Sequence, residues 1–230
     1  MQPSTSADLS FEVEGAGRVS ALLEVPADAR SCYVFAHGAG AGMRHAFMQA
    51  VAAGLAARAV ATLRFQFPAM ERGSGRPDTP RVAHAAVRAA VAAAASTGLP
   101  LLAGGKSFGG RMTSQAQAEA PLAGVRGLVF FGFPLHPAGR PATERGVHLD
   151  AVACPMLFLQ GTRDELADVA LIRTVTARLG EGTTLTLFDD ADHSFHVRKS
   201  SGRSDADVLG LMLDTTARWI DAILALPNAH

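Results

Sequence analysis

The stretch "LLAGGKSFGG", residues 101–110, poses a choice on which the interpretation of the whole chain depends. The Gly-Lys-Ser of residues 105–107 matches the end of a phosphate-binding loop, whereas residues 105–109 match the G-x-S-x-G pattern of a serine nucleophile at a strand-to-helix turn. A phosphate-binding loop needs a glycine five residues before Gly105, and the chain has Pro100 at that position. The sequence therefore favours the nucleophile over the phosphate-binding loop.

Ser107 has the neighbours that such a turn requires. An apolar run leads into Gly105, and a stretch typical of a helix follows Gly109. A nucleophile in this turn adopts a strained backbone, so the residues two positions away on either side must be small, and both are glycine. The amide of Phe108 then lies at the N-terminus of the helix, where the helix dipole favours a developing oxyanion.

Short apolar runs alternate with helical patterns along the chain, which predicts a mostly parallel central sheet with helices on both faces. The first two runs lie close together and predict an N-terminal antiparallel hairpin. The predicted strands are 9–14, 19–25, 32–37, 60–65, 100–105, 126–133, 156–161 and 184–188, and the predicted helices are about 43–58, 80–96, 108–119, 166–179 and 205–225. Two long connections, 66–80 and 134–155, are each too short for a cap domain. We expect a single α/β domain over residues 1–230 with an open site.

The composition indicates a folded protein with a small-molecule partner. Of 230 residues 48% are hydrophobic, and 21 Lys+Arg balance 21 Asp+Glu, so there is no electrostatic footprint for nucleic acid or an anionic membrane. The first residues lack the pattern of a signal peptide and no apolar run is long enough for a membrane span, so we expect a cytoplasmic protein. Cys32 and Cys154 have no metal-binding spacing and are expected to be buried structural thiols. We expect no metal and no cofactor, and the oligomeric state stays open.

A serine nucleophile needs a base and an acid, and after such a turn the chain order is serine, acid, histidine. Asp164 follows the seventh predicted strand and His193 follows the eighth. The carboxyl ends of parallel strands share one edge of the sheet, so both side chains arrive where Ser107 lies. We therefore predict Ser107, Asp164 and His193 as the catalytic residues.

Other residues compete for these roles. Asp164 is also placed to cap the helix that begins near residue 166, Asp168 is a weaker candidate for the acid, and His196 competes locally for the base. The remaining aspartates near His193 are more typical of turns, and the remaining histidines outside the strand ends are expected at the surface or in packing. These residues are Asp189, Asp190 and Asp192, and His45, His84 and His148.

The second oxyanion donor is expected from the loop after the third strand, "FAHGAGAGMRHAF", residues 35–47. Its small residues let the backbone approach a substrate closely. We predict the amide of Ala39 as the donor beside that of Phe108, with Gly40 second and also in contact with substrate; His37 is expected to brace the loop. The glycine spacing here does not match the G-x-G-x-x-G pattern of dinucleotide binding.

Substrate specificity is the least determined feature. Arginines in and after the first long connection are candidates to hold an anionic substrate group, with solvated surface residues as the alternative: Arg72, Arg76 and Arg81. Aromatic residues near the strand ends are candidates to line an acyl pocket: Phe108, Phe133 and Phe195. Phe133, at the end of a strand, has the core as its alternative.

Taken together, several successive motifs are similar to a known group of proteins. The motifs are "HGAGAGM", "LRFQFPAMERGSGRPD", "GGKSFGGRM", "FFGFPLHP", "LQGTRD" and "DADHSF". From about residue 30 to 220 the chain resembles the α/β-hydrolase group of testis-expressed protein 30-like and NSL-complex subunit 3-like proteins, which is related to dienelactone hydrolases. The resemblance implies an α/β-hydrolase fold and implies the triad at Ser107, Asp164 and His193. Dienelactone hydrolases proper carry a cysteine nucleophile where this chain has serine.

The sequence thus supports a serine hydrolase that cleaves a small carboxylic ester or thioester through an acyl-enzyme. Because some relatives in the resembling group act as subunits of complexes, a protein-interaction module on the same scaffold is the alternative. The two hypotheses differ in whether an activated serine is needed.

Overall fold

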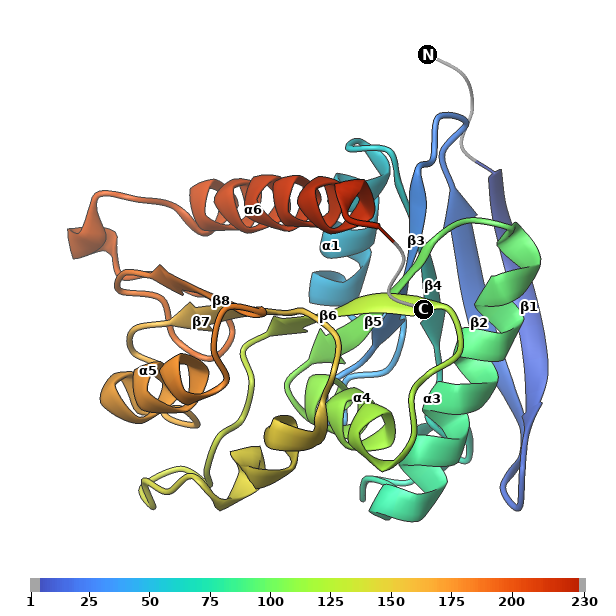
Figure 1. The fold of residues 1–230 in the computed structure, drawn as a ribbon, viewed down its shortest axis with the longest axis horizontal. Coiled ribbons are helices and arrows are strands. Elements are labelled where there is room, and N and C mark those ends of the chain that lie inside the picture. Colours follow the sequence, from blue (N-terminus) through green and yellow to red (C-terminus); the bar gives the residue numbers. More distant parts are fainter. Residues whose placement is uncertain (1–4, 228–230) are drawn as a thin grey trace.

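Eight strands form one sheet that organises the molecule (Figure 1). The structure, a computed structural model, describes residues 5–227. The strand order is β1-β2-β4-β3-β5-β6-β7-β8; β2 pairs antiparallel with both β1 and β4, and the other pairs are parallel. The strands are β1 (Thr5–Val13), β2 (Gly17–Val25), β3 (Ser31–Ala36), β4 (Val60–Phe65), β5 (Leu101–Lys106), β6 (Val125–Phe131), β7 (Met156–Gly161) and β8 (Thr183–Phe188). The predicted mostly parallel sheet with its N-terminal antiparallel hairpin is confirmed.

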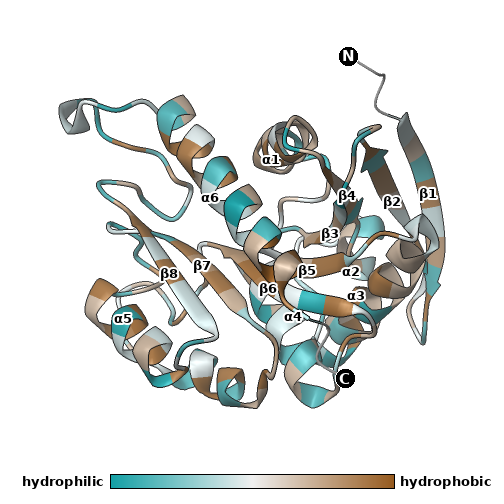
Figure 2. Ribbon diagram, turned by 45° about the horizontal axis from the view of Figure 1, so that its top comes forward, coloured by the Kyte–Doolittle hydropathy of each residue, from teal (hydrophilic) through white to brown (hydrophobic). Residues whose placement is uncertain are grey.

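The hydrophobicity of each strand follows its place in the sheet. The central strands β3, β4 and β7 are buried along their whole length, because helices cover both of their faces. The edge strand β1 is exposed at most positions, and β8 at the other edge alternates threonine and leucine. Figure 2 shows this difference as paler edge strands around a brown centre.

The helices are those predicted, together with short elements that the sequence patterns did not reveal. The helices are α1 (Ala46–Ala56), α2 (Pro68–Glu71), α3 (Pro80–Ala94), α4 (Phe108–Glu119), α5 (Val169–Arg178) and α6 (Asp205–Ala225), with 3-10 turns η1 (Ala95–Thr97), η2 (Glu144–Ala151) and η3 (Lys199–Ser201). The unpredicted α2 and η2 lie in the two long connections, and neither connection builds a cap domain. In the part of the chain that the structure describes, no helix combines the length and the hydrophobicity needed to cross a bilayer.

Two helices start later than predicted because a capping side chain ends the preceding loop. The Asp168 side chain accepts a hydrogen bond from the Leu171 amide at 3.0 Å, so α5 begins at Val169 rather than near residue 166. Likewise His45 Nδ1 accepts from the Phe47 amide at 3.2 Å, and α1 begins after it.

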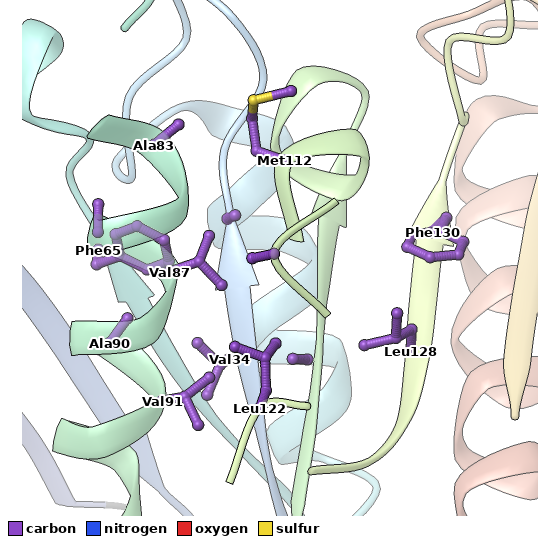
Figure 3. Close-up of a cluster of buried hydrophobic side chains, with 14 of the residues drawn as sticks. Val34, Phe65, Ala83, Val87, Ala90, Val91, Met112, Leu122, Leu128 and Phe130 are labelled. Atoms are coloured by element: carbon purple, nitrogen blue, oxygen red, sulfur yellow. The ribbon is translucent and has the colours of Figure 1, made fainter. Parts of the chain in front are cut away.

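The helices cover the sheet in two layers, each with its own apolar core. Helices α1 and α6 lie on one face, and α3, α4 and α5 lie on the other (Figure 1). On the second face, Val87 of α3 lies beside Phe65 of β4, and Met112 of α4 and Phe130 of β6 belong to the same buried cluster (Figure 3). This double cover makes the ends of the parallel strands the accessible part of the sheet.

The parallel strands bring distant loops to one edge. β5 leads into Ser107, β7 into the loop with Asp164, β8 into the loop with His193, and β3 into the glycine-rich loop. Because these strands are neighbours or nearly so, segments more than 80 residues apart meet there: Ser107 and His193 are separated by 86 positions in the sequence.

Candidate active site

The chain turns sharply at Ser107, between β5 and α4. Its φ of 50° and ψ of −115° lie where residues with a side chain are rarely found. A Cβ on Gly105 would lie 2.4 Å from the carbonyl oxygen of Ala36, and a Cβ on Gly109 would lie 2.4 Å from the same atom. The two glycines of the G-x-S-x-G pattern are therefore a steric requirement of the turn.

Ser107, His193 and Asp164 form a chain of two hydrogen bonds. His193 Nε2 lies 2.8 Å from Ser107 Oγ, and His193 Nδ1 lies 2.7 Å from Asp164 Oδ2. Since an ionised carboxylate only accepts, Nδ1 carries the proton and Nε2 is left to accept the hydroxyl hydrogen of Ser107. The Asp164 side chain is fully buried, while that of His193 is 25% exposed, so solvent reaches the imidazole but not the carboxylate.

Further hydrogen bonds hold Asp164 in place. Its Oδ1 accepts from the Leu166 amide at 2.8 Å, and its Oδ2 accepts from the side chain of Gln160. Gln160 is fully buried at the end of β7, and its Oε1 accepts from the Phe133 amide at 2.9 Å. Gln160 was not among the predicted site residues; its signal in the sequence is a polar side chain inside the apolar run "MLFLQG".

The competing aspartates and His196 have other partners. Asp168 is the N-cap of α5, and Asp192 Oδ1 accepts from the amides of Ser194 and His196 in its own turn. The ring of His196 lies 2.7 Å from Asp205 at the start of α6. None of these three side chains contacts Ser107 by a hydrogen bond within residues 5–227.

The remaining histidines lie away from this site. His84 Nδ1 lies 2.9 Å from Glu119 Oε1 between α3 and α4, and His148 Nε2 lies 2.8 Å from Ser114 Oγ. Burial and the nearby Arg111 guanidinium lower the pKa of His148 to about 4. His84 thus links α3 to α4, and His148 links η2 to α4, so both take part in packing, as the sequence predicts.

The amides of Ala39 and Phe108 have no hydrogen-bond acceptor among the described residues, and both residues line one pocket. Phe108 is the first residue of α4, so its amide adds to the positive end of the helix dipole. His37 braces the glycine-rich loop, because its Nε2 accepts from the Phe67 amide at 3.1 Å and its Nδ1 lies 2.7 Å from the Gly38 carbonyl oxygen. Burial lowers the pKa of His37, which keeps this ring neutral.

Residues 29–221 match the family described as an alpha/beta hydrolase domain. The chain belongs to this family.

Solved structures of similar fold cover nearly the whole of this α/β hydrolase. A dienelactone hydrolase from Anabaena variabilis shares 20% identity, with a TM-score of 0.74 over 96% of this chain and 99% of its own. A serine hydrolase without a lid from Xanthomonas campestris shares 22% identity, with a TM-score of 0.73 over 100% and 99% of the two chains. An α/β serine hydrolase homologue from Coxiella burnetii shares 18% identity, with a TM-score of 0.74 over 94% and 99%. At these identities the likeness shows the fold.

The pocket that Ala39 and Phe108 share is narrow. The loop residues Ala39 and Gly40 form one side of it, Phe67 and Phe108 form its apolar part, and Arg76 stands at its rim. The cavity volume is about 10 Å³, which is enough for about one water molecule. The predicted contact residue Gly40, with φ of +71°, is therefore located at the pocket.

Arg72 does not line this pocket, and its role in substrate binding stays a prediction. Its Nη2 lies 3.5 Å from Asp78 Oδ1, and the side chain borders the turn between β1 and β2. The third candidate, Arg81, is exposed at the start of α3. Of the predicted arginines, Arg76 is the one at the pocket.

Phe133 and Phe195 do not line this pocket either, and their role in an acyl pocket stays a prediction. Phe133 is fully buried, with its ring centroid 5.4 Å from that of Phe130, so its alternative place in the core holds. Phe195 is 3% exposed, and its ring packs on Phe47 at 6.0 Å. Both rings are removed from solvent by aromatic neighbours that come from other strands and helices.

The thiols and the metal-binding residue types form no second site. Cys32 is buried and Cys154 is partly buried, both as free thiols, and burial raises their pKa values to about 12 and about 11. Across residues 5–227 no group of three or more histidine, cysteine, aspartate or glutamate side chains is placed to hold a metal ion.

Proposed function

We propose that this α/β hydrolase is a serine hydrolase that cleaves a small carboxylic ester or thioester through an acyl-enzyme intermediate. The observation that carries the proposal is the continuous path from Ser107 Oγ to His193 Nε2, at 2.8 Å, and from His193 Nδ1 to Asp164, at 2.7 Å. A serine hydroxyl is a poor nucleophile until an adjacent base accepts its proton, and an oriented imidazole supplies that base.

In the proposed acylation, His193 Nε2 accepts the Ser107 proton as Oγ forms a bond with the substrate carbonyl carbon. The carbonyl oxygen becomes an oxyanion, and the free amides of Ala39 and Phe108 donate hydrogen bonds to it. Collapse of this intermediate breaks the bond to the alcohol or thiol, which takes the proton from Nε2. The acyl group then remains on Ser107.

Deacylation repeats the same steps with water. His193 accepts a proton from water, the hydroxide adds to the acyl carbon, and the proton returns to Ser107 Oγ as the acid leaves. Asp164 stabilises the imidazolium in both halves, and Gln160 and the Leu166 amide keep its carboxylate directed at Nδ1.

The size and charge of the pocket support a small substrate group. The pocket between Ala39, Phe67 and Phe108 has a volume of about 10 Å³, enough for about one water molecule, so it favours a small substrate group over a long acyl chain. Arg76 at the rim is placed to attract an anionic group on the substrate. The structural neighbour from Anabaena variabilis is a dienelactone hydrolase, and a lactone is an internal ester, which accords with the same reaction class.

The first experiment is labelling with a fluorophosphonate, which reacts covalently with an activated serine. We expect the adduct on Ser107, located by mass spectrometry of the digested protein, and no adduct in His193→Ala. The variant Ser107→Ala should lose activity by up to about 10⁶-fold, as a triad serine does elsewhere.

Absence of label on folded protein would contradict the proposal and favour the interaction module. We also propose that the chain belongs to the narrower group of testis-expressed protein 30-like and NSL-complex subunit 3-like proteins. We further propose a cytoplasmic location. Copurification of a stoichiometric partner from cells, with no label at Ser107, would support the module.

A further inference from the structure

Lys106, the residue before the nucleophile, has an unusual environment for a lysine. Its Nζ donates a hydrogen bond to the main-chain carbonyl oxygen of His193 at 2.5 Å. The same Nζ lies 5.8 Å from the centroid of the Phe47 ring and 5.4 Å from that of Phe195. Within residues 5–227 it forms no ion pair with a carboxylate, so its contacts are one carbonyl and two aromatic faces.

Gly132, just after β6, provides the space in which these groups meet. Its φ is +67°, and a Cβ built on it would lie 2.9 Å from Lys106 Nζ and 3.4 Å from both the Nδ1 and the carbonyl oxygen of His193. A side chain at this position would displace the ammonium. Because residue 132 is glycine, Lys106 Nζ can lie beside His193.

We propose that Lys106 is a positioning residue that holds His193 in register with Ser107, an inference that rests on the proposed function. Lys106 is joined to Ser107 by the peptide bond and to His193 by the ammonium-carbonyl hydrogen bond, so it ties together both ends of the Ser107-His193 pair. A charged donor makes this bond stronger than a neutral one, and the two rings add cation-π attraction.

Burial of the Lys106 ammonium costs solvation free energy, which argues against a lysine that only fills space. Burial lowers the pKa of Lys106 to about 8, and the carboxylates of Asp164 and Asp192 oppose that shift. With His193, these are the titratable groups that face the ammonium from the loops after β7 and β8. Above about pH 8 the ammonium loses its proton, and the hydrogen bond from Lys106 Nζ to the His193 carbonyl oxygen weakens.

The test compares the rate of fluorophosphonate labelling at Ser107, and kcat and KM for p-nitrophenyl acetate, between wild type and Lys106→Met. The matched control is Lys199→Met, which changes the chain's other lysine, an exposed one. We expect Lys106→Met to lower the labelling rate and kcat about 10- to 100-fold with KM within about threefold, as a misplaced catalytic group does. Lys199→Met should match wild type.

The pH profile separates positioning by charge from simple packing. In wild type, the labelling rate should fall as the pH rises through about 8, and this alkaline fall should be absent in Lys106→Met. The wild-type profile needs no variant, so it decides the proposal even if Lys106→Met does not fold. A wild-type rate that stays level to pH 9.5, or a folded Lys106→Met that labels within threefold of wild type, would overturn it. No labelling of wild type at any pH would instead refute the proposed hydrolase.

Discussion

Gln160 donates a hydrogen bond to the same Asp164 oxygen, Oδ2, that accepts a hydrogen bond from His193 Nδ1. The carboxylate is thereby held from two sides in a fully buried position, with its plane set before substrate arrives. Orientation of the acid is thus a property of β7 and of its neighbour β6, through the bond from the Phe133 amide to Gln160.

Replacement of Gln160 by methionine should reduce both stability and turnover. The change leaves the buried Phe133 amide without its acceptor, which costs about 1–3 kcal/mol of unfolding free energy. It also frees the Asp164 carboxylate to rotate, so we expect kcat to fall about tenfold with KM unchanged. Urea unfolding and steady-state kinetics measure the two effects. Full activity in the variant would show that the Leu166 amide alone orients the acid.

A methyl group at either glycine of the G-x-S-x-G turn should destroy the site. In Gly105→Ala or Gly109→Ala the new Cβ would lie 2.4 Å from the Ala36 carbonyl oxygen, so backbone must move. We expect a loss of about 1–3 kcal/mol or more in stability and no label at Ser107.

Gly210→Ala is the matched control for these glycine changes. Residue 210 lies within α6, and a Cβ there meets nothing within 4 Å. Alanine should therefore stabilise the protein by up to about 1 kcal/mol and leave labelling unchanged. Normal labelling of Gly105→Ala would contradict the steric account of the turn.

Arg76 should discriminate between substrates by charge. We expect Arg76→Glu to raise KM for an ester with a free carboxylate, such as p-nitrophenyl hemisuccinate, about 10- to 100-fold, because a charge-assisted contact is replaced by repulsion. KM for neutral p-nitrophenyl acetate should stay within about threefold. Arg72→Glu, on the side chain that faces Asp78, should affect neither substrate. Equal shifts for both esters in Arg76→Glu would refute the assignment.

His148 should make the fold sensitive to mild acid. Its pKa in the folded protein is lowered from 6.5 to about 4, so between these values the unfolded chain binds a proton that the folded one does not. Stability therefore falls as the pH drops from about 6.5 to about 4. Urea unfolding over this range should show a shallower decline in His148→Gln than in wild type. Parallel curves would mean that the folded protein accommodates the charged ring.

Much of the architecture was accessible from local patterns. Each of the eight apolar runs forms a strand, because a run long enough to cross a doubly covered sheet has little alternative to burial. Ser107, Asp164 and His193 were recognisable because each follows a strand whose carboxyl end must lie at the shared edge. Helix starts were less accurate, since a single capping residue such as Asp168 decides them.

Which side chains face the site was decided by tertiary packing alone. Arg72 and Arg76 lie in the same connection between β4 and α3. Arg72 forms an ion pair with Asp78, whereas Arg76 lines the pocket. Phe133 is a core residue because the rings of β6 and β7 surround it.

The sequence by itself determined the order of strands along the chain, the turn at Ser107 and the strand ends that deliver Asp164 and His193, because these follow from periodicity and from local sterics. Only the tertiary structure decided the partners of Gln160 and Lys106, because each is bonded to a residue that is remote in sequence or held by another loop. The direction of a side chain depends on the neighbours that close around it, and those neighbours are chosen by the fold as a whole.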